Sequence, residues 1–455
     1  MTLRLSNTPT TWVTAICGFL AVALGILAGL DAKLAIAASL ALAFTLISLA
    51  DLSIGVALFS FLGFVVVLPN FAGETLSVLK VAALPLLISW IAMITRERTH
   101  ERNLLYAHPA FCLLMLVFIG WVLLGYVWAF DPGQVPAAVF RYALAAILVF
   151  IIFAAVRTER DVKMIAVAMV AGAVCAAVYG FLNPAPEEFG QLTRLGGTLG
   201  NPNELATVLV IGIGLSAGLA AATKDLVARS LALSAGAICF VAILMTGSRG
   251  GLIALVAMLL AAIVVAAGKR TRLIVATMLL LLVGLGYVLT VAPPQSRERI
   301  LHPGSGSGRT DIWTVGSRMI AAHPVEGVGA GNFPVASIQY LLRPGSLKES
   351  QYVVDTPKVA ENTYLEVLAE LGIVGALLFL SLIAFSVSCG LKALSLIRGR
   401  GQPGLQALTT AFVVSTFGLL VADFFGSKEY ARELWLLMGM GIALLSIARR
   451  INPTT

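Results

Sequence analysis

The stretch PAAVFRYALAAILVFIIFAAV, residues 136–156, carries a single charged side chain, that of Arg141. About 20 helical residues cross the roughly 30 Å hydrocarbon core of a bilayer, so this stretch predicts a transmembrane helix. Similar apolar runs predict further spans over residues 12–30, 34–50, 54–69, 76–94, 109–130, 163–182, 204–222, 229–246, 251–267, 273–291, 362–391, 405–425 and 433–448. The sequence therefore predicts fourteen spans, and twelve or thirteen stay open because the second and third runs are short.

The composition supports this prediction over the whole chain. Of the 455 residues, 59% are hydrophobic and 12% are charged, whereas soluble globular chains average roughly 45–50% and about 25%. A soluble enzyme is excluded, and the predicted fold is an all-α polytopic membrane protein. The net charge of +8 resides in short clusters between the apolar runs, a pattern typical of loops that flank membrane helices and not of a nucleic-acid-binding protein.

The basic clusters predict the orientation of the chain. They comprise Arg96, Arg98 and Arg102; Arg157, Arg160 and Lys163; Lys224 and Arg229; Lys269, Arg270 and Arg272; Lys392, Arg398 and Arg400; and Arg449 and Arg450. With fourteen spans, all six clusters fall on one side, which the positive-inside rule identifies as the cytoplasm. We therefore expect a multi-pass protein of the bacterial inner membrane with both termini cytoplasmic.

We expect four segments along the chain: N-terminal transmembrane helices (1–182), transmembrane helices with outward arginine motifs (183–291), a long periplasmic loop (292–361) and C-terminal transmembrane helices (362–455). The loop is far longer than ordinary connections, and such loops are usually functional or disordered. Within it, RTDIWTVGSRMIAAH (309–323) places Ile312, Val315, Gly316, Met319 and Ile320 on one helical face. This pattern predicts an amphipathic helix along the membrane surface.

Three arginines on the predicted outer side lie among glycines: Arg194 in RLGGTLGNPNE, Arg249 in TGSRGG and Arg309 in GSGSGRTDIW. A guanidinium offers a planar fork of donors, and glycine lets the backbone approach closely, so this setting suits a diphosphate. The alternative for each arginine is an ordinary loop residue at the lipid headgroup layer. Their occurrence together on one side favours an anion-binding site.

A carboxylate stands where the twelfth predicted span begins, in ENTYLEVLAELGIVG (361–375). Glu361 lies at the outer boundary, where a general base could accept a proton from a hydroxyl. The alternative is a favourable acid beside the positive end of the helix dipole. Further along this span, Glu366 and Glu370 are typical of interior pairing residues. The four histidines are scattered, so the sequence predicts no metal site and no cofactor.

These motifs, in this order, resemble the O-antigen ligase and O-antigen polymerase superfamily of bacterial membrane glycosyltransferases. The resemblance rests on GGTLGNPNELA (196–206), TGSRGG (246–251), GRTDIWTVGSRMIAAHPVEGVGAGNF (308–333) and ENTYLEVLAELGIVG (361–375). It implies a metal-independent enzyme that moves a glycan from a polyprenyl-diphosphate-linked donor to a hydroxyl of a glycan or lipid-glycan acceptor. The reaction would occur among membrane lipids at the periplasmic face, in cell-surface polysaccharide biosynthesis.

The resemblance also implies roles for individual residues. Glu361, Arg249 and Arg194 are the candidate catalytic residues, with the two arginines neutralising the diphosphate. Candidate substrate-binding residues are Arg309, Asn201, Asn203, Asn362, Trp313, Arg318 and Tyr364. Ligases of the family have a histidine at the position of Glu361, followed by the spacing that Asn362, Gly372 and Gly375 keep here. The glutamate leaves a polymerase or another relative at least as probable as a ligase.

A transporter or flippase of a lipid-linked glycan is the alternative function. Many secondary transporters show paired, interrupted segments in their two halves. Here the special motifs crowd into the second half of the chain and onto one side. This asymmetry favours an enzyme over a transporter.

Overall fold

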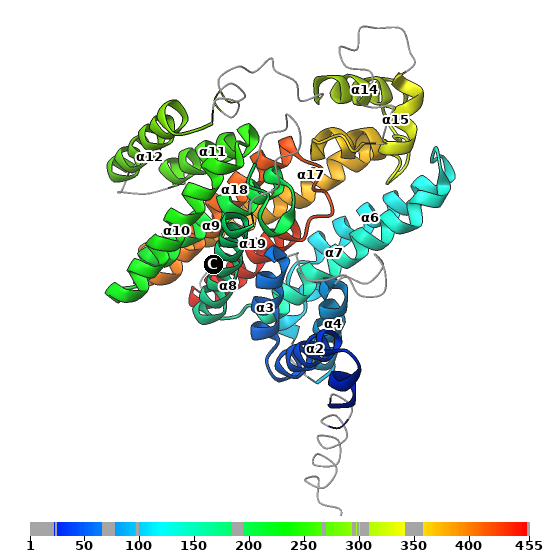
Figure 1. Ribbon diagram of the computed structural model, residues 1–455. Coiled ribbons are helices and arrows are strands. Elements are labelled where there is room, and N and C mark those ends of the chain that lie inside the picture. Colours follow the sequence, from blue (N-terminus) through cyan, green and yellow to red (C-terminus); the bar gives the residue numbers. More distant parts are fainter. Residues whose placement is uncertain are drawn as a thin grey trace, which may run out of the picture.

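The computed structural model describes residues 25–65, 78–96, 100–183, 194–265, 270–293, 309–341 and 358–452, with residues 22, 297 and 300. These residues form helices, turns and irregular segments but no β-strand. The α-helices are α2 (Ala32–Ala50), α3 (Leu52–Phe64), α4 (Val78–Arg96), α5 (Leu104–Ala107), α6 (Pro109–Leu124), α7 (Val135–Ala155), α8 (Glu159–Leu182), α9 (Pro202–Ala222), α10 (Leu226–Thr246), α11 (Arg249–Val265), α12 (Arg270–Thr290), α14 (Arg309–Ala322), α15 (Phe333–Leu341), α17 (Thr363–Ile397), α18 (Pro403–Ala422) and α19 (Arg432–Ile451) (Figure 1).

The all-α polytopic membrane architecture predicted from the sequence is confirmed. Within the described residues, nine helices are long and apolar enough to cross a membrane, and four shorter apolar helices accompany them. The predicted spans from 34–50 onward each coincide with one of these helices. Most of the predicted span 12–30, the end of 54–69 and much of the long loop lie outside the described residues.

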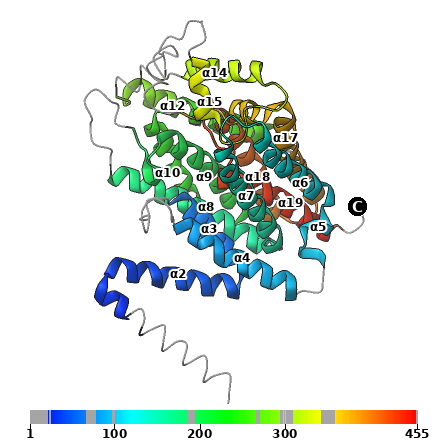
Figure 2. The ribbon, with the colours of Figure 1, turned by 90° about the vertical axis from the view of Figure 1, so that its right-hand side faces the viewer.

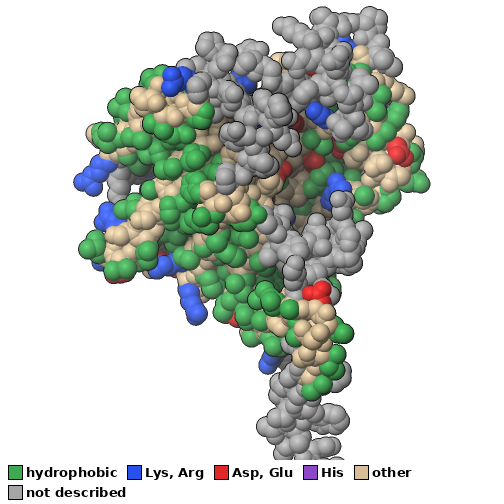
Figure 3. All heavy atoms as spheres, in the orientation of Figure 1, with side chains coloured by type: hydrophobic (Ala, Val, Ile, Leu, Met, Phe, Trp, Pro, Cys, Tyr) green, Lys and Arg blue, Asp and Glu red, His purple; other side chains and the backbone are tan. Residues whose placement is uncertain are grey.

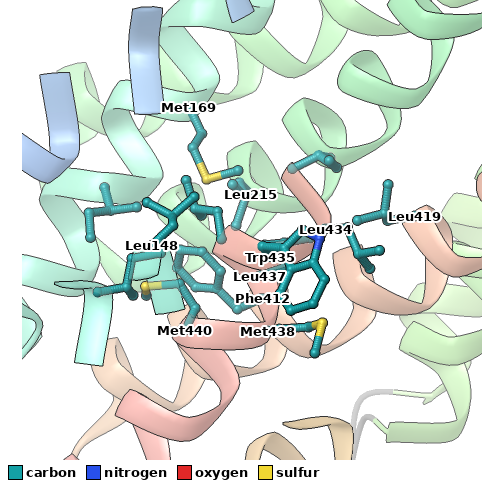
Figure 4. Close-up of a cluster of buried hydrophobic side chains, with 14 of the residues drawn as sticks. Leu148, Met169, Leu215, Phe412, Leu419, Leu434, Trp435, Leu437, Met438 and Met440 are labelled. Atoms are coloured by element: carbon teal, nitrogen blue, oxygen red, sulfur yellow. The ribbon is translucent and has the colours of Figure 1, made fainter. Parts of the chain in front are cut away.

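The core is centred on α9, which packs against α8, α10 and α18. In the most apolar 18-residue stretch of α9, 78% of the residues are buried, whereas in the same kind of stretch of the peripheral helix α12 only 11% are buried. Figure 4 shows the adjoining cluster of buried side chains, in which Trp435 of α19 lies near Phe412 of α18. On the face drawn in Figure 3, hydrophobic side chains cover most of the described part and charged side chains are few. This surface suits a helix bundle surrounded by lipid.

Basic residues from three of the clusters, Arg157, Arg398 and Arg450, lie at helix ends and contact backbone carbonyls there. Arg157, after α7, donates to the carbonyl of Glu101, and Arg450 of α19 donates to the carbonyl of Arg157 at 2.6 Å. Arg398, after α17, donates to the carbonyl of Val265 at the end of α11, also at 2.6 Å. We call these helix ends the basic end, and the glycine-rich arginine motifs lie at the opposite helix ends.

Helix α17 is interrupted at Gly372, where the backbone has φ 63° and ψ −172°. The segment 324–333 packs into this break: the amide of Ile373 donates to the carbonyl of Pro324 at 2.9 Å. A Cβ on Gly372 would lie 2.0 Å from the carbonyl oxygen of Val325, so only glycine fits here. The span predicted over 362–391 is confirmed as a membrane-length helix, and the structure adds an interruption at Gly372, where segment 324–333 packs against it.

Helices α14 and α15 lie together at one edge of the molecule in both ribbon views (Figures 1 and 2). Ile312, Val315 and Met319 of α14 join Phe333 of α15 in a small core that also includes Ala369 of α17. The predicted amphipathic helix is therefore confirmed over Arg309–Ala322. Its apolar face is buried against protein, however, and is not left free for the membrane surface as the sequence predicted.

Candidate active site

The site begins at the N-terminus of α9. Asn201 is the N-cap residue, and its side-chain oxygen accepts from the amide of Asn203 at 2.9 Å. The side-chain oxygen of Asn203 accepts from Arg194 Nη2 at 3.2 Å and from Ser248 Oγ at 2.9 Å. Arg194 also donates from Nε to the carbonyl of Thr246 at 2.8 Å. The structure thus joins the NPNE and TGSRGG motifs through one asparagine.

Arg249 is the first residue of α11. Its side chain has no hydrogen bond or ion pair with any residue that the structure describes. The glycine that follows explains part of the motif, because a Cβ on Gly250 would lie 2.6 Å from the Cβ of Phe425. The motif therefore places an arginine, unpaired within the described structure, at a close contact between α11 and the end of α18.

Beside Phe425, which Gly250 also contacts, Arg309 forms an ion pair with Glu361. Arg309 Nε lies 2.6 Å from Glu361 Oε2, and Nη2 donates to the carbonyl of Phe425 at 3.1 Å. The Arg309 side chain is 15% exposed and that of Glu361 is 38% exposed. Two candidates that are 52 positions apart in sequence are thus brought into direct contact.

The backbone also fixes the position of Glu361. Its φ of 48° makes it the one non-glycine residue with positive φ among those described, a conformation that costs an L-residue about 1–2 kcal/mol. The next residue, Asn362, is the N-cap of α17 and accepts from the amides of Tyr364 and Leu365, both at 3.1 Å. Glu361 consequently lies just outside the helix, not in its first turn.

Aromatic side chains border the ion pair. Trp313 Nε1 donates to the carbonyl of Ala360 at 3.2 Å, and its ring meets Phe424 edge to face with centroids 5.6 Å apart. The Tyr364 hydroxyl donates to the carbonyl of Leu420 at 2.6 Å. The rings of Trp313, Phe424 and Tyr364 therefore pack together beside Glu361.

Arg318 is not brought into this group of residues. Its guanidinium donates to the carbonyl of Tyr340 at 2.9 Å, near the end of α15. Along α14 it lies nine residues beyond Arg309, which corresponds to about 13 Å of helix. The structure therefore gives this candidate a contact that joins α14 to α15.

The connection between α18 and α19 joins the candidate site, although no sequence motif indicated it. Lys428 Nζ lies 2.9 Å from Glu204 Oε1, and the Lys428 amide donates to Thr363 Oγ1 at 2.8 Å. This connection therefore joins the start of α9 to the start of α17. A usable signal was present, because Lys428 is a basic residue on the side where the positive-inside rule predicts few.

Glu366 and Glu370 are interior pairing residues, as predicted. Glu366 is buried and accepts from the Ser427 hydroxyl and from the amide of Ala360. Glu370 accepts from the amides of Gly331 and Phe333 at 2.7 and 2.9 Å, which holds segment 324–333 against α17. Neighbouring Glu429 lies in the α18–α19 connection, and burial raises its pKa to about 7.

The electrostatic character of the site follows from these contacts. Helices α9, α11 and α17 start close to one another, because hydrogen bonds and the Lys428–Glu204 ion pair connect their first residues. Each helix therefore directs the positive end of its dipole toward the site. Arg249 adds a positive charge with no ion-pair partner among the described residues, and Arg194 adds a guanidinium held by the Thr246 carbonyl and Asn203. Among the described residues, no group of three or more His, Cys, Asp or Glu could hold a metal ion. The arrangement suits an anion held by guanidinium and amide donors.

Comparison with known proteins finds similarity to a solved structure and to one protein family. A chain from a solved structure described as "Structural coordination of polymerization and crosslinking by a peptidoglycan synthase complex" is similar at a TM-score of 0.40 and 15% identity, covering 75% of this chain and 98% of that chain. No curated protein matches. A family model described as O-antigen ligase matches residues 234–380, which include Arg249, Arg309 and Glu361. The chain is thus a multi-pass membrane protein in which residues 234–380 are similar to the O-antigen ligase family.

Proposed function

We propose that the protein transfers a glycan from a polyprenyl-diphosphate-linked donor to an acceptor hydroxyl. The observation that carries the proposal is the arrangement around the O-antigen ligase domain: Arg249, unpaired within the described structure, and Arg194 lie on one side, with the Arg309–Glu361 pair on the other. A cationic region and a carboxylate base are the two elements that such a transfer requires.

The donor diphosphate binds on the side formed by α9 and α11. Arg249 and Arg194 donate to its oxygens, assisted by the helix N-termini. As the bond between the anomeric carbon and the diphosphate oxygen breaks, negative charge grows on the leaving group. Preorganised donors in a water-poor site stabilise this charge strongly.

Glu361 accepts the proton on the other side. The acceptor hydroxyl attacks the anomeric carbon and forms the new glycosidic bond, its proton passes to the Glu361 carboxylate, and polyprenyl diphosphate leaves. Arg309 contacts both Glu361 and the carbonyl of Phe425, so it orients the base and borders the diphosphate region. Trp313 and Tyr364 position the acceptor sugar, and α14 covers the site.

The site lies at the periplasmic face of the inner membrane in this proposal. Arg157, Arg398 and Arg450 lie at the basic end, and the positive-inside rule assigns that end to the cytoplasm. Both chain termini are then cytoplasmic, and the product belongs to cell-surface polysaccharide biosynthesis.

The test is to incubate the purified protein in lipid with a polyprenyl-diphosphate-linked repeat unit and to follow glycan size and polyprenyl diphosphate release. A ladder of growing products identifies a polymerase, and a single transfer to a second acceptor identifies a ligase. Movement of intact donor across the bilayer without diphosphate release would overturn the proposal and identify a transporter.

A further inference from the structure

Building on the proposed function, we propose that Lys428 is a further diphosphate-binding residue, and that Glu204 is its internal counter-ion, which the diphosphate displaces. Lys428 follows α18, outside the four motifs that identify the superfamily. Its position in the site follows from the structure alone.

The first argument is its location. Glu204 follows Asn203 directly in the chain, and Asn203 accepts from Arg194 and Ser248. Lys428 Nζ is 2.9 Å from Glu204 Oε1. The Lys428 ammonium group therefore contacts the residue that follows Asn203, beside the N-terminus of α9. Asn203 is the residue that holds Arg194 and the start of α11.

The second argument is that the backbone of Lys428 is held in place. Its amide donates to Thr363 Oγ1 at 2.8 Å, and the carbonyl of Gly426 accepts from the Thr363 amide at 2.9 Å. On either side in sequence, Ser427 donates to the buried Glu366, and Glu429 is itself buried. The Lys428 ammonium consequently projects from a fixed base, as a preorganised anion ligand requires.

The third argument is the parallel between the two ion pairs of the site. In both, the cation is the more enclosed partner: Lys428 is 14% exposed against 39% for Glu204, and Arg309 is 15% exposed against 38% for Glu361. The carboxylates are thus the partners with room to move. A diphosphate carries more charge than a carboxylate and would repel Glu204 as it approaches the α9 N-terminus.

The test measures binding without turnover, with farnesyl diphosphate as the probe and the full-length protein in detergent. Lys428→Ala should weaken binding about 10- to 100-fold, the range for a lost charge-assisted hydrogen bond. Glu204→Gln should tighten binding about threefold or more, because the competing carboxylate is gone. Lys428→Arg should restore most of the affinity. A purely structural ion pair would make the alanine and glutamine variants change in the same direction, which would overturn the inference.

Further variants separate the possible failures. Arg398→Ala, which removes an arginine at the basic end, should bind as the unmodified protein does and controls for net charge. Arg249→Ala tests the proposed function: if it weakens binding while Lys428→Ala does not, only the Lys428 inference fails. If neither weakens binding, the proposed diphosphate site fails as well.

A farnesyl monophosphate arm distinguishes a diphosphate from the single phosphate of a lipid headgroup. The unmodified protein should prefer the diphosphate, and Lys428→Ala should reduce that preference. Equal binding of both probes, with equal losses in Lys428→Ala, would assign Lys428 to a headgroup and contradict the inference. Thermal unfolding of each variant confirms that it is folded.

Discussion

The two sides of the site differ in how their cations are paired. On the α9–α11 side, Arg194 contacts a backbone carbonyl and a side-chain amide, and Arg249 has no partner among the described residues. On the α14–α17 side, Arg309 is neutralised by Glu361. Arg249, which has no partner among the described residues, suits an incoming anion, and the Glu361 carboxylate suits proton acceptance. In the proposed function, donor binding and base catalysis are accordingly divided between the two sides.

The largest expected effect is on the α14–α17 side. Glu361→Gln should lower the rate of transfer about 10²- to 10⁴-fold, because the amide cannot accept the hydroxyl proton. Glu361→His should retain part of the activity and lose it as the pH falls through about 6.5, where the imidazole becomes protonated. Rates of polyprenyl diphosphate release across a pH series measure both effects. Full activity of the glutamine variant would remove Glu361 from the mechanism.

On the α9–α11 side, Arg249→Ala should lower kcat/KM about 10²- to 10³-fold, the usual cost of losing a donor to developing negative charge. The kcat/KM of Arg249→Lys should lie between those of the unmodified protein and Arg249→Ala, because lysine keeps the charge but lacks the planar fork of donors. Initial rates at several donor concentrations give the measurement, with membrane abundance as the control. An alanine variant with unchanged kcat/KM would place the diphosphate elsewhere.

A smaller effect is expected from Arg318, which lies on α14 but away from the ion pair. Arg318→Ala removes the hydrogen bond to Tyr340, a loss of about 1 kcal/mol of stability. We expect Arg318→Ala to have a lower unfolding temperature and a modestly lower transfer rate, because less of the variant is folded. A 100-fold loss of transfer at unchanged stability would instead return Arg318 to the substrate-binding residues.

The smallest expected effect is a change in stability that depends on Glu429, a buried residue in the connection between α18 and α19. Burial raises its pKa from 4.5 to about 7, so the folded protein keeps a proton that the unfolded chain releases between these values. Stability from this group therefore falls as the pH rises from about 4.5 to 7 and stays lower above that range. Glu429→Gln should unfold at a higher temperature than the unmodified protein at pH 8, and the gain should shrink at pH 5.

The control for this prediction is Glu101→Gln, which alters an exposed glutamate. Unfolding temperatures of both variants at the two pH values make the comparison. A stabilisation by Glu429→Gln that is equal at pH 5 and pH 8 would show that the charge of Glu429 is not responsible.

Much of the fold could be predicted from the sequence because each span is set by local hydrophobicity. The predicted span 362–391 begins one residue before α17, whose N-cap is Asn362. The break at Gly372 could not be predicted, because it depends on a contact between Pro324 and Ile373, which are 49 positions apart. The local sequence pattern around Gly372 does not indicate a contact with a segment so distant in the chain.

The same division holds for the candidate site. Arg194 and Arg249 were assigned to one side because each follows or precedes a span end there. The pairing of Arg309 with Glu361 and of Lys428 with Glu204 arises from tertiary packing across 52 and more than 200 positions. Arg309 and Arg318 were both predicted to bind substrate, and both lie on α14, yet their side chains contact different partners.

The most direct test of the divided site is an experimental structure of the Glu361→Gln variant bound to a polyprenyl-diphosphate-linked donor. The variant should bind the donor but not transfer the glycan. The account predicts the diphosphate within hydrogen-bonding distance of Arg249 and Arg194, with the anomeric carbon facing residue 361. A diphosphate bound at the basic end, or contacting neither arginine, would contradict it.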